Sequence, residues 1–352
     1  MKGDAAGLRA DETGVKPGGR RRRRGGEKQM VPEAEFGSYY GRPVLKETVW
    51  GPDIPAYLFL GGLAGCSSAL AAAAHLSGHP ELARASKAGA AGAISLSMAA
   101  LVHDLGRPAR FVNMLRVLKV TSPMSVGTWL LSAYTPLALG AAASAVTGKL
   151  PSAGLAATLP AAVLGAGVAT YTSVLLCDTA VPAWHEGYRE MPFLFAGSAA
   201  AAAGGLGMLA VRPGRAAQAV EFGVIGAAAE LTAKRLLLRR LGPAAEPYQQ
   251  GRAGTMMKAS EALTTAGLAG AVLAGRSRSR SRAAAALSGA ALLAASALTR
   301  FGVFEAGRAS ARDPKYTVGP QRQRLRAQAA QARQAAQARQ GNEPAEQGES
   351  AS

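Results

Sequence analysis

Cysteine and histidine are scarce in this sequence, with two cysteines and four histidines among 352 residues. Cys66 and Cys177 each stand alone inside an apolar stretch, which excludes a disulfide framework and the four-cysteine ligand set of an iron–sulfur cluster. The histidines fall in loops or at the ends of predicted helices: His75, His79, His103 and His185. A membrane dihaem site needs paired histidines within helices. We therefore expect neither haem nor an iron–sulfur cluster in this chain.

Aromatic residues are also few (5%), and the alternation of apolar and polar residues that marks strands is lacking. Long alanine-rich apolar runs stand in their place, and a bilayer accepts such runs as helices, because each backbone polar group must be satisfied internally. A span needs about 20 mostly apolar residues. The candidate spans are 55–75, 87–103, 125–146, 155–177, 192–211, 216–238, 260–275 and 283–302. The sequence thus predicts an all-α integral membrane protein, a polytopic bundle of about eight transmembrane helices.

Polar sequence flanks the predicted bundle, which occupies residues 55–302. Residues 1–30 are predicted to be a disordered basic arm, and residues 31–54 form a more specific lead-in to the first span. The tail at 303–352 is of low complexity, with an amphipathic or transient helix expected within 321–340. We interpret the tail as cytoplasmic.

The formal net charge is +18. Such a balance can indicate nucleic-acid binding, but here the arginines flank membrane spans, where they orient the helices and contact anionic membrane lipid. We expect no nucleic-acid partner. The connectors on the N-terminal side are the more basic ones, although a basic cluster at 276–282 lies on the other side. The positive-inside rule then predicts a multi-pass protein of the plasma membrane with both termini in the cytoplasm.

Small and charged residues inside the bundle have simple structural interpretations. Close helix packing is predicted at six glycines: Gly61, Gly62, Gly65, Gly204, Gly205 and Gly207. Glu230 and Lys234 are one turn apart in the sixth span and are predicted to form an ion pair. Asp104 and Arg107 are predicted to form a salt bridge within their loop.

The connector between the second and third spans carries the most distinctive residues. It reads DLGRP at 104–108, RFVNMLRV at 110–117 and TSPMSVGTWLL at 121–131. Two further stretches accompany it, WGPDIPAYLFLGGLAG at 50–65 and DTAVPAWHE at 178–186. In this combination and spacing, the chain resembles the NrfD family.

The resemblance implies a membrane subunit of a polysulfide-reductase-type complex, of the kind used in anaerobic respiration. Such subunits exchange electrons between membrane quinone (menaquinone or ubiquinone) and a partner ferredoxin-like iron–sulfur subunit. That partner serves a catalytic subunit, often of the molybdopterin type. The resemblance also implies a quinone site within the first four helices, at about residues 50–190, near the end that faces the iron–sulfur partner.

Topology gathers ionisable and aromatic residues at one end of the predicted bundle, where the first span begins and the second and fourth spans end. A quinone site needs donors to two carbonyl oxygens and a protonatable group, which Tyr, His and Asp supply. The resemblance implicates a polar residue of the first span and a tyrosine of the fourth, here Asp53 or Tyr57 and Tyr171. The candidate residues for quinone binding and proton handling are Asp53, Tyr57, His103, Asp104, Arg107, Tyr171, Asp178 and His185.

Other interpretations of the same residues stay open. Tyr57 and Tyr171 also fit interfacial or packed core aromatic residues. A polytopic transporter would place ionisable residues near the bilayer midplane and break helices in matching halves. A passive membrane anchor without a redox role would tolerate changes at Tyr171 and Asp178, whereas a quinone-reactive subunit would not.

Overall fold

The computed structural model describes residues 45–341 except residues 47, 49, 108 and 277–280. The predicted basic arm and most of the lead-in therefore lie outside the described residues. Throughout the described part of the chain, all regular secondary structure is helical. The all-α class predicted from the alanine-rich apolar runs is confirmed.

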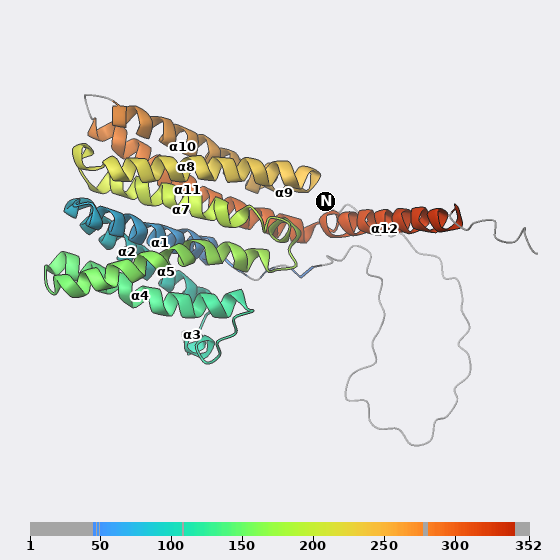
Figure 1. The fold of residues 1–352 in the computed structure, drawn as a ribbon, viewed down its shortest axis with the longest axis horizontal. Coiled ribbons are helices and arrows are strands. Elements are labelled where there is room, and N and C mark those ends of the chain that lie inside the picture. The colour runs from blue at the N-terminus through green and yellow to red at the C-terminus, as the bar shows by residue number, and fades with distance from the viewer. Residues whose placement is uncertain (1–44, 47, 49, 108, 277–280, 342–352) are drawn as a thin grey trace, which may run out of the picture. The chain divides into compact units, whose positions relative to one another are not determined.

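Eight long helices form the described bundle (Figure 1). They are α1 (Asp53–Leu76), α2 (Pro80–Asp104), α4 (Pro123–Thr147), α5 (Pro151–Cys177), α7 (Met191–Ala210), α8 (Ala217–Leu241), α10 (Gly251–Arg276) and α11 (Arg282–Arg312). Each of them contains or overlaps one predicted span. The last one, α11, continues beyond the predicted end of the bundle at residue 302.

Shorter helices occupy the connectors. They are α3 (Ala109–Met114), α6 (Pro182–His185), η1 (Pro213–Arg215), η2 (Gly242–Ala245) and α9 (Glu246–Gln249). A final helix, α12 (Lys315–Gly341), contains the helix expected within 321–340 and begins before it. Proline stands in the first turn of several long helices, where its missing N–H leaves no hydrogen bond unmade: Pro80, Pro123, Pro151 and Pro192.

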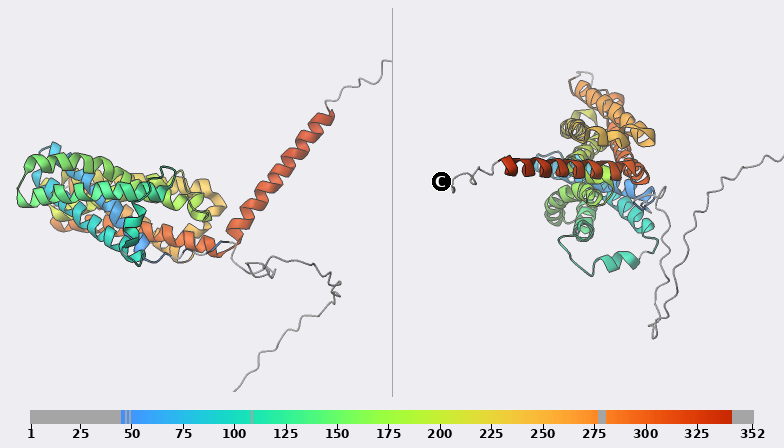
Figure 2. Two further views of the ribbon diagram at one scale, coloured as in Figure 1. Left: turned by 90° about the horizontal axis from the view of Figure 1, so that it is seen from below. Right: turned by 90° about the vertical axis from the view of Figure 1, so that its right-hand side faces the viewer.

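The long helices form two groups of four. The first group is α1, α2, α4 and α5, and the second group is α7, α8, α10 and α11. The right-hand view of Figure 2 looks along the helices and shows the first group, blue to green, on one side of the second group, yellow to orange. The two groups meet mainly along α1 and α7, with further contacts from α5 and α11.

Glycines allow close contact between two helices of the same group. At Gly65 of α1 and Gly165 of α5 the backbones meet, and a Cβ atom added to either residue would collide with the other helix. Gly205 of α7 and Gly289 of α11 approach each other in the same way. The predicted role of the glycines as sites of close packing is therefore confirmed at these contacts.

Six of the long helices are long and apolar enough to cross a membrane: α1, α2, α4, α5, α7 and α11. The helices α8 and α10 are of similar length, but their sequences carry more charged residues, including Glu230, Lys234 and Glu261. The chain is a polytopic helical membrane protein.

Successive long helices run in opposite directions, which gives the bundle two ends (Figure 1). At one of them, called here the Asp53 end, α1, α4, α7 and α10 begin and the other four helices end. At the opposite end, called the His75 end, α2, α5, α8 and α11 begin. The predicted site residues belong to the Asp53 end.

Candidate functional site

Asp53 and His103 form the one hydrogen bond that the structure shows between two of the predicted site residues in the described part of the chain. Asp53 is the first residue of α1, His103 lies in the last turn of α2, and Oδ2 of the carboxylate is 2.9 Å from Nδ1 of the imidazole. The His103 side chain is 81% exposed and that of Asp53 is 35% exposed. A carboxylate at one ring nitrogen orients the imidazole and leaves the other nitrogen facing outward, where it can exchange protons.

Two tyrosines lie deeper in the first group. Tyr57, one turn along α1 from Asp53, is 4% exposed, and its backbone carbonyl accepts a hydrogen bond from Ser97 Oγ at 3.1 Å. Tyr171 of α5 packs its ring against Gly127 of α4, where a Cβ atom would collide with the ring. The Tyr171 hydroxyl is buried and has no hydrogen-bond partner among the described residues. Because buried hydroxyls are nearly always bonded, this one is a candidate for a hydrogen bond to a ligand or to water.

The loop after α2 differs from its predicted arrangement. No ion pair joins Asp104 and Arg107 in the described residues, so the prediction of a salt bridge within the loop is wrong. The Arg107 side chain is exposed, and the backbone turns at Gly106 with a φ of 69°. Arg110 closes the loop instead, because its Nη1 donates a hydrogen bond to the carbonyl of Leu105 at 3.1 Å. Arg107 is therefore a surface cation at the Asp53 end.

Asp178 and His185 follow the C-terminal end of α5, at the Asp53 end of the bundle. Asp178 is exposed and follows the last helical residue, with its N–H donating to the carbonyl of Val174 at 2.9 Å. His185 is exposed and folds back so that its Nδ1 lies 3.1 Å from the carbonyl oxygen of Cys177. Neither residue forms a hydrogen bond or ion pair with Asp53 or with another predicted site residue in the described part of the chain.

The short helix α6 is built around Trp184, which is fully buried. Its indole Nε1 donates to the carbonyl of Val303 at 2.8 Å, and its ring stacks between Trp50 and Phe304 with centroid distances of 5.9 and 5.8 Å. Tyr248 adds a hydrogen bond from its hydroxyl to the carbonyl of Ala183 at 2.6 Å. The segment that carries His185 is thereby held to α9 and α11 at the Asp53 end.

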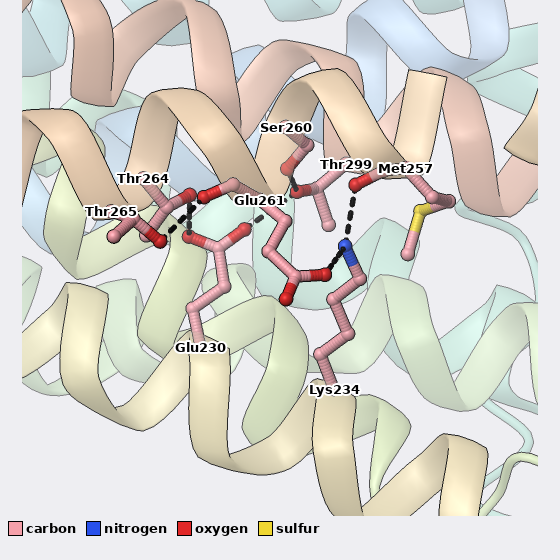
Figure 3. A network of polar contacts seen from close by, with 8 residues as sticks. All are labelled: Glu230, Lys234, Met257, Ser260, Glu261, Thr264, Thr265 and Thr299. Carbon is pink, nitrogen blue, oxygen red and sulfur yellow. Dashed lines mark hydrogen bonds and ion pairs between the residues drawn. The ribbon is translucent and has the colours of Figure 1, made fainter. Parts of the chain in front are cut away.

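A buried polar network in the second group overturns another prediction (Figure 3). Lys234 does not pair with Glu230. Its Nζ lies 2.9 Å from Oε2 of Glu261, on α10, and also donates to the carbonyl of Met257. Glu230 instead accepts hydrogen bonds from Thr299 of α11 at 2.5 Å and from Thr264 of α10 at 3.4 Å. The two neighbouring residues of α8 thus bind two different partner sets.

Arg300 of α11 was not identified from the sequence, although an arginine inside an apolar run is a visible signal. The residue is fully buried between the two groups, and its Nη2 donates to the carbonyl of Phe195 at 2.8 Å. Its guanidinium carbon lies 3.9 Å from the centroid of the Phe195 ring, a cation–π arrangement. Its Nε and Nη1 have no hydrogen-bond partner among the described residues.

Two cavities stand out, and no predicted site residue lines either of them. The smaller, about 10 Å³, is enclosed by the first group and lined in part by Ser68, Lys87 and Thr158. It has room for about one water molecule. Lys87 is 6% exposed and its Nζ lies 3.4 Å from Nδ1 of His75. The larger, an open groove of about 480 Å³, lies at the His75 end. Within the residues described, no three His, Cys, Asp or Glu side chains are placed to hold a metal ion.

The family comparison agrees with this architecture. The family model for polysulphide reductase, NrfD, matches residues 44–238, from within the lead-in to α8. This range contains the whole first group and every predicted site residue. A comparison with curated proteins gave no match. Because the family model covers more than half of the 352 residues, the chain belongs to the NrfD family of membrane subunits of redox complexes.

Proposed function

We propose that this chain is the quinone-reactive membrane subunit of a multi-subunit oxidoreductase. In this role it exchanges electrons between membrane menaquinone or ubiquinone and a ferredoxin-like iron–sulfur subunit, and it anchors a molybdopterin-type catalytic subunit. The observation that carries the proposal is the buried hydroxyl of Tyr171, which has no hydrogen-bond partner in the described part of the chain. It lies about two turns from the Asp53 end of a bundle of the NrfD family.

The residues of the first group suit the chemistry of a quinone. Oxidation of a quinol to a quinone releases two electrons and two protons, and reduction takes up the same number. Tyr171 supplies a hydrogen-bond donor to one carbonyl oxygen. His103, oriented by Asp53, exchanges protons with water at the surface. Tyr57 and the apolar side chains around it offer contact for the ring and the isoprenoid tail.

The segment after α2 supports docking of the electron-transfer partner at the Asp53 end. Its apolar side chains are exposed, with Val112 at 63%, Val117 at 66% and Val120 at 79%. Arg110 precedes them in the sequence, Arg116 lies among them, and both arginines are also exposed. Exposed apolar side chains beside cations fit a partner whose surface is acidic around an apolar centre. A cluster docked there would lie on the side of the bundle that carries Asp53 and His103.

The distribution of basic residues supports a cytoplasmic location for this end in the plasma membrane. Exposed basic residues at the Asp53 end include Arg107, Arg110, Arg116, Lys119, Arg235, Arg239 and Arg252. In this orientation, the iron–sulfur and catalytic subunits are cytoplasmic.

A transporter is the second candidate, and one observation favours it. Glu230, Lys234 and Arg300 are ionisable and almost completely buried within long helices. Ionisable groups at membrane depth are costly and mark ion or substrate paths in many membrane proteins. Glu230 and Lys234, however, are bonded to α10 and α11, which ties them to helix packing.

The test compares Tyr171→Phe with Tyr134→Phe in the complex purified from native membranes. Both tyrosines belong to the first group, but the Tyr134 hydroxyl is bonded to Ser68 at 2.8 Å. We expect Tyr171→Phe to lower quinone turnover about tenfold or more, because a hydrogen bond to the quinone is lost. Tyr134→Phe should leave turnover within about twofold of the wild type. A passive anchor would show unchanged turnover in both variants.

Purification in mild detergent tests the proposed partners independently. We expect a ferredoxin-like and a molybdopterin-type subunit to be identified with the chain by mass spectrometry. Repeated isolation of the chain alone would contradict the redox proposal and favour the transporter, for which uptake into proteoliposomes is the direct measurement.

A further inference from the structure

The His75 end carries an open groove that the proposed redox function does not use. It lies where α2 and α11 begin and α4 and α7 end, and its volume is about 480 Å³. Its lining combines three arginines with small apolar side chains, among them Arg84, Arg212, Arg282, Ala88, Val146 and Val211. This combination of cations and apolar surface at the edge of a membrane bundle suits a molecule that has both an anionic and an apolar part.

The three arginines bring positive charge that no described residue neutralises through a hydrogen bond or an ion pair. Arg84 comes from α2, Arg212 from the link after α7, and Arg282 from the first residue of α11. All three side chains are exposed, and none has a hydrogen bond or ion pair with another described residue. The carboxylate in the lining, Glu81, is already paired with Arg215. Cations held together in this way attract an anion of matching size.

An apolar strip leads from the groove along α2. Arg84, Ala88, Gly92 and Leu96 are spaced at four-residue intervals, lie on one helix face and are all exposed. A Cβ atom added at Gly92 would meet nothing within 4 Å, so this face of α2 is open there. From Arg84 to Leu96 the helix rises by about 18 Å. This length is close to half of the hydrocarbon core of a bilayer, about 15 Å.

We propose that the groove binds one anionic phospholipid, with its phosphate on Arg84, Arg212 and Arg282 and an acyl chain along the α2 strip. A groove at the end of membrane helices lies at the depth of the lipid headgroups, and arginine suits the recognition of a phosphate group. A free phosphate would use the arginines alone and would leave the apolar strip without a role. The strip therefore favours lipid over a soluble anion.

The experiment uses the full chain, delipidated in mild detergent, and counts bound lipid by native mass spectrometry. Phosphatidylglycerol is compared with phosphatidylcholine of the same acyl chains. We expect tighter binding of phosphatidylglycerol to the wild type. The Arg84→Gln, Arg212→Gln and Arg282→Gln changes should each weaken it about fivefold, and the three together about a hundredfold. Because these side chains are exposed, the variants should keep the elution volume and thermal midpoint of the wild type.

The matched control removes the same charge at the other end, through Arg235→Gln, Arg239→Gln and Arg252→Gln. These side chains are also exposed. We expect the control to bind phosphatidylglycerol as the wild type does. Equal weakening in both triple variants would show that net charge governs binding, and wild-type binding in the groove variant would remove the site; either result overturns the proposal.

A second arm separates lipid from a soluble anion. Gly92→Phe fills the α2 strip and leaves the arginines in place, so it should weaken phosphatidylglycerol about tenfold and leave binding of glycerol phosphate unchanged. If Gly92→Phe has no effect and millimolar inorganic phosphate displaces the lipid, the groove is an anion site without lipid specificity. The proposal would then be overturned.

Discussion

The two groups of helices differ in the polar side chains that they bury. The first group buries hydroxyls without hydrogen-bond partners among the described residues: Ser67, Ser86, Thr135, Tyr171 and Thr172. The second group buries ionisable side chains, Glu230, Lys234 and Arg300. Both Glu230 and Lys234 are bonded across helices, although Arg300 keeps two unpartnered nitrogens. Lys87 is the buried cation of the first group.

The unpartnered hydroxyls make the first group suited to binding a ligand, whereas the bonded ionisable side chains hold the helices of the second group together. Unpartnered buried hydroxyls cost free energy unless water or a ligand satisfies them. Bonded carboxyl and ammonium groups, in contrast, fix the register of neighbouring helices. The family model covers the whole first group but ends within α8, so α10 and α11, which supply Glu261, Thr264, Thr299 and Arg300, lie outside it. The redox proposal therefore rests on the first group.

The largest effect is expected from removing the carboxyl group of Glu230. Glu230→Leu should lower the free energy of unfolding by about 3 kcal/mol, because Thr299 and Thr264 lose an acceptor and buried Arg300 loses the nearby carboxyl. Glu230→Gln keeps an acceptor oxygen and should cost less, about 1–2 kcal/mol. Unfolding by sodium dodecyl sulfate in mild detergent measures both values.

Glu221→Leu is the matched control, since Glu221 lies on the same helix and is exposed. Its free energy of unfolding should stay within about 0.5 kcal/mol of the wild type. If Glu230→Leu behaves like this control, the network does not hold the second group, and the comparison between the groups fails.

The long helices could be predicted from the sequence because their cause is local. Alanine-rich apolar runs require helices in a bilayer wherever the neighbouring helices lie. The close contact at Gly65 could also be anticipated, since small side chains permit close approach of backbones. The side-chain partners could not be predicted in this way. Lys234 pairs with Glu261 and not with Glu230 because α10 brings a second carboxylate within reach. The spacing of residues along α8 does not indicate which helix packs beside it.

The candidate site was predictable in part for the same reason. Counting helices placed Asp53 and His103 at one end of the bundle, but their hydrogen bond depends on the contact between α1 and α2. The salt bridge predicted between Asp104 and Arg107 followed from their proximity in sequence and is absent from the described loop. The neighbours of buried Arg300 could not be foreseen, since its guanidinium occupies the space that Gly62 leaves beside α1.

Within the first group, two tyrosines separate a bonded hydroxyl from an unpartnered one. Tyr134→Phe should lower the free energy of unfolding by about 1–2 kcal/mol, because it leaves the buried Ser68 hydroxyl without its partner. Tyr171→Phe should leave stability unchanged or slightly raised, since no protein hydrogen bond is lost. The same unfolding assay measures both. An equal loss in Tyr171→Phe would mean that its hydroxyl has a protein partner, and the quinone proposal would lose its main support.

The smallest effect is expected where a charge pair is exposed rather than buried. Lys315 Nζ lies 3.0 Å from Glu246 Oε1 and joins α9 to the first turn of α12. This hydrogen bond holds the pKa of the Glu246 carboxyl below its ordinary value of 4.5. A lowered pKa means that the pair stabilises the folded state above that ordinary value, and that the contribution disappears as the pH falls through the lowered one. Amide exchange protection at the start of α12 should therefore be about twofold higher in the wild type than in Glu246→Gln at neutral pH, and the difference should vanish in acid.

The control is Glu221→Gln, which makes the same change on α8 and should leave protection of α12 unaltered. Equal protection of the wild type and Glu246→Gln at neutral pH would contradict the assignment of this ion pair.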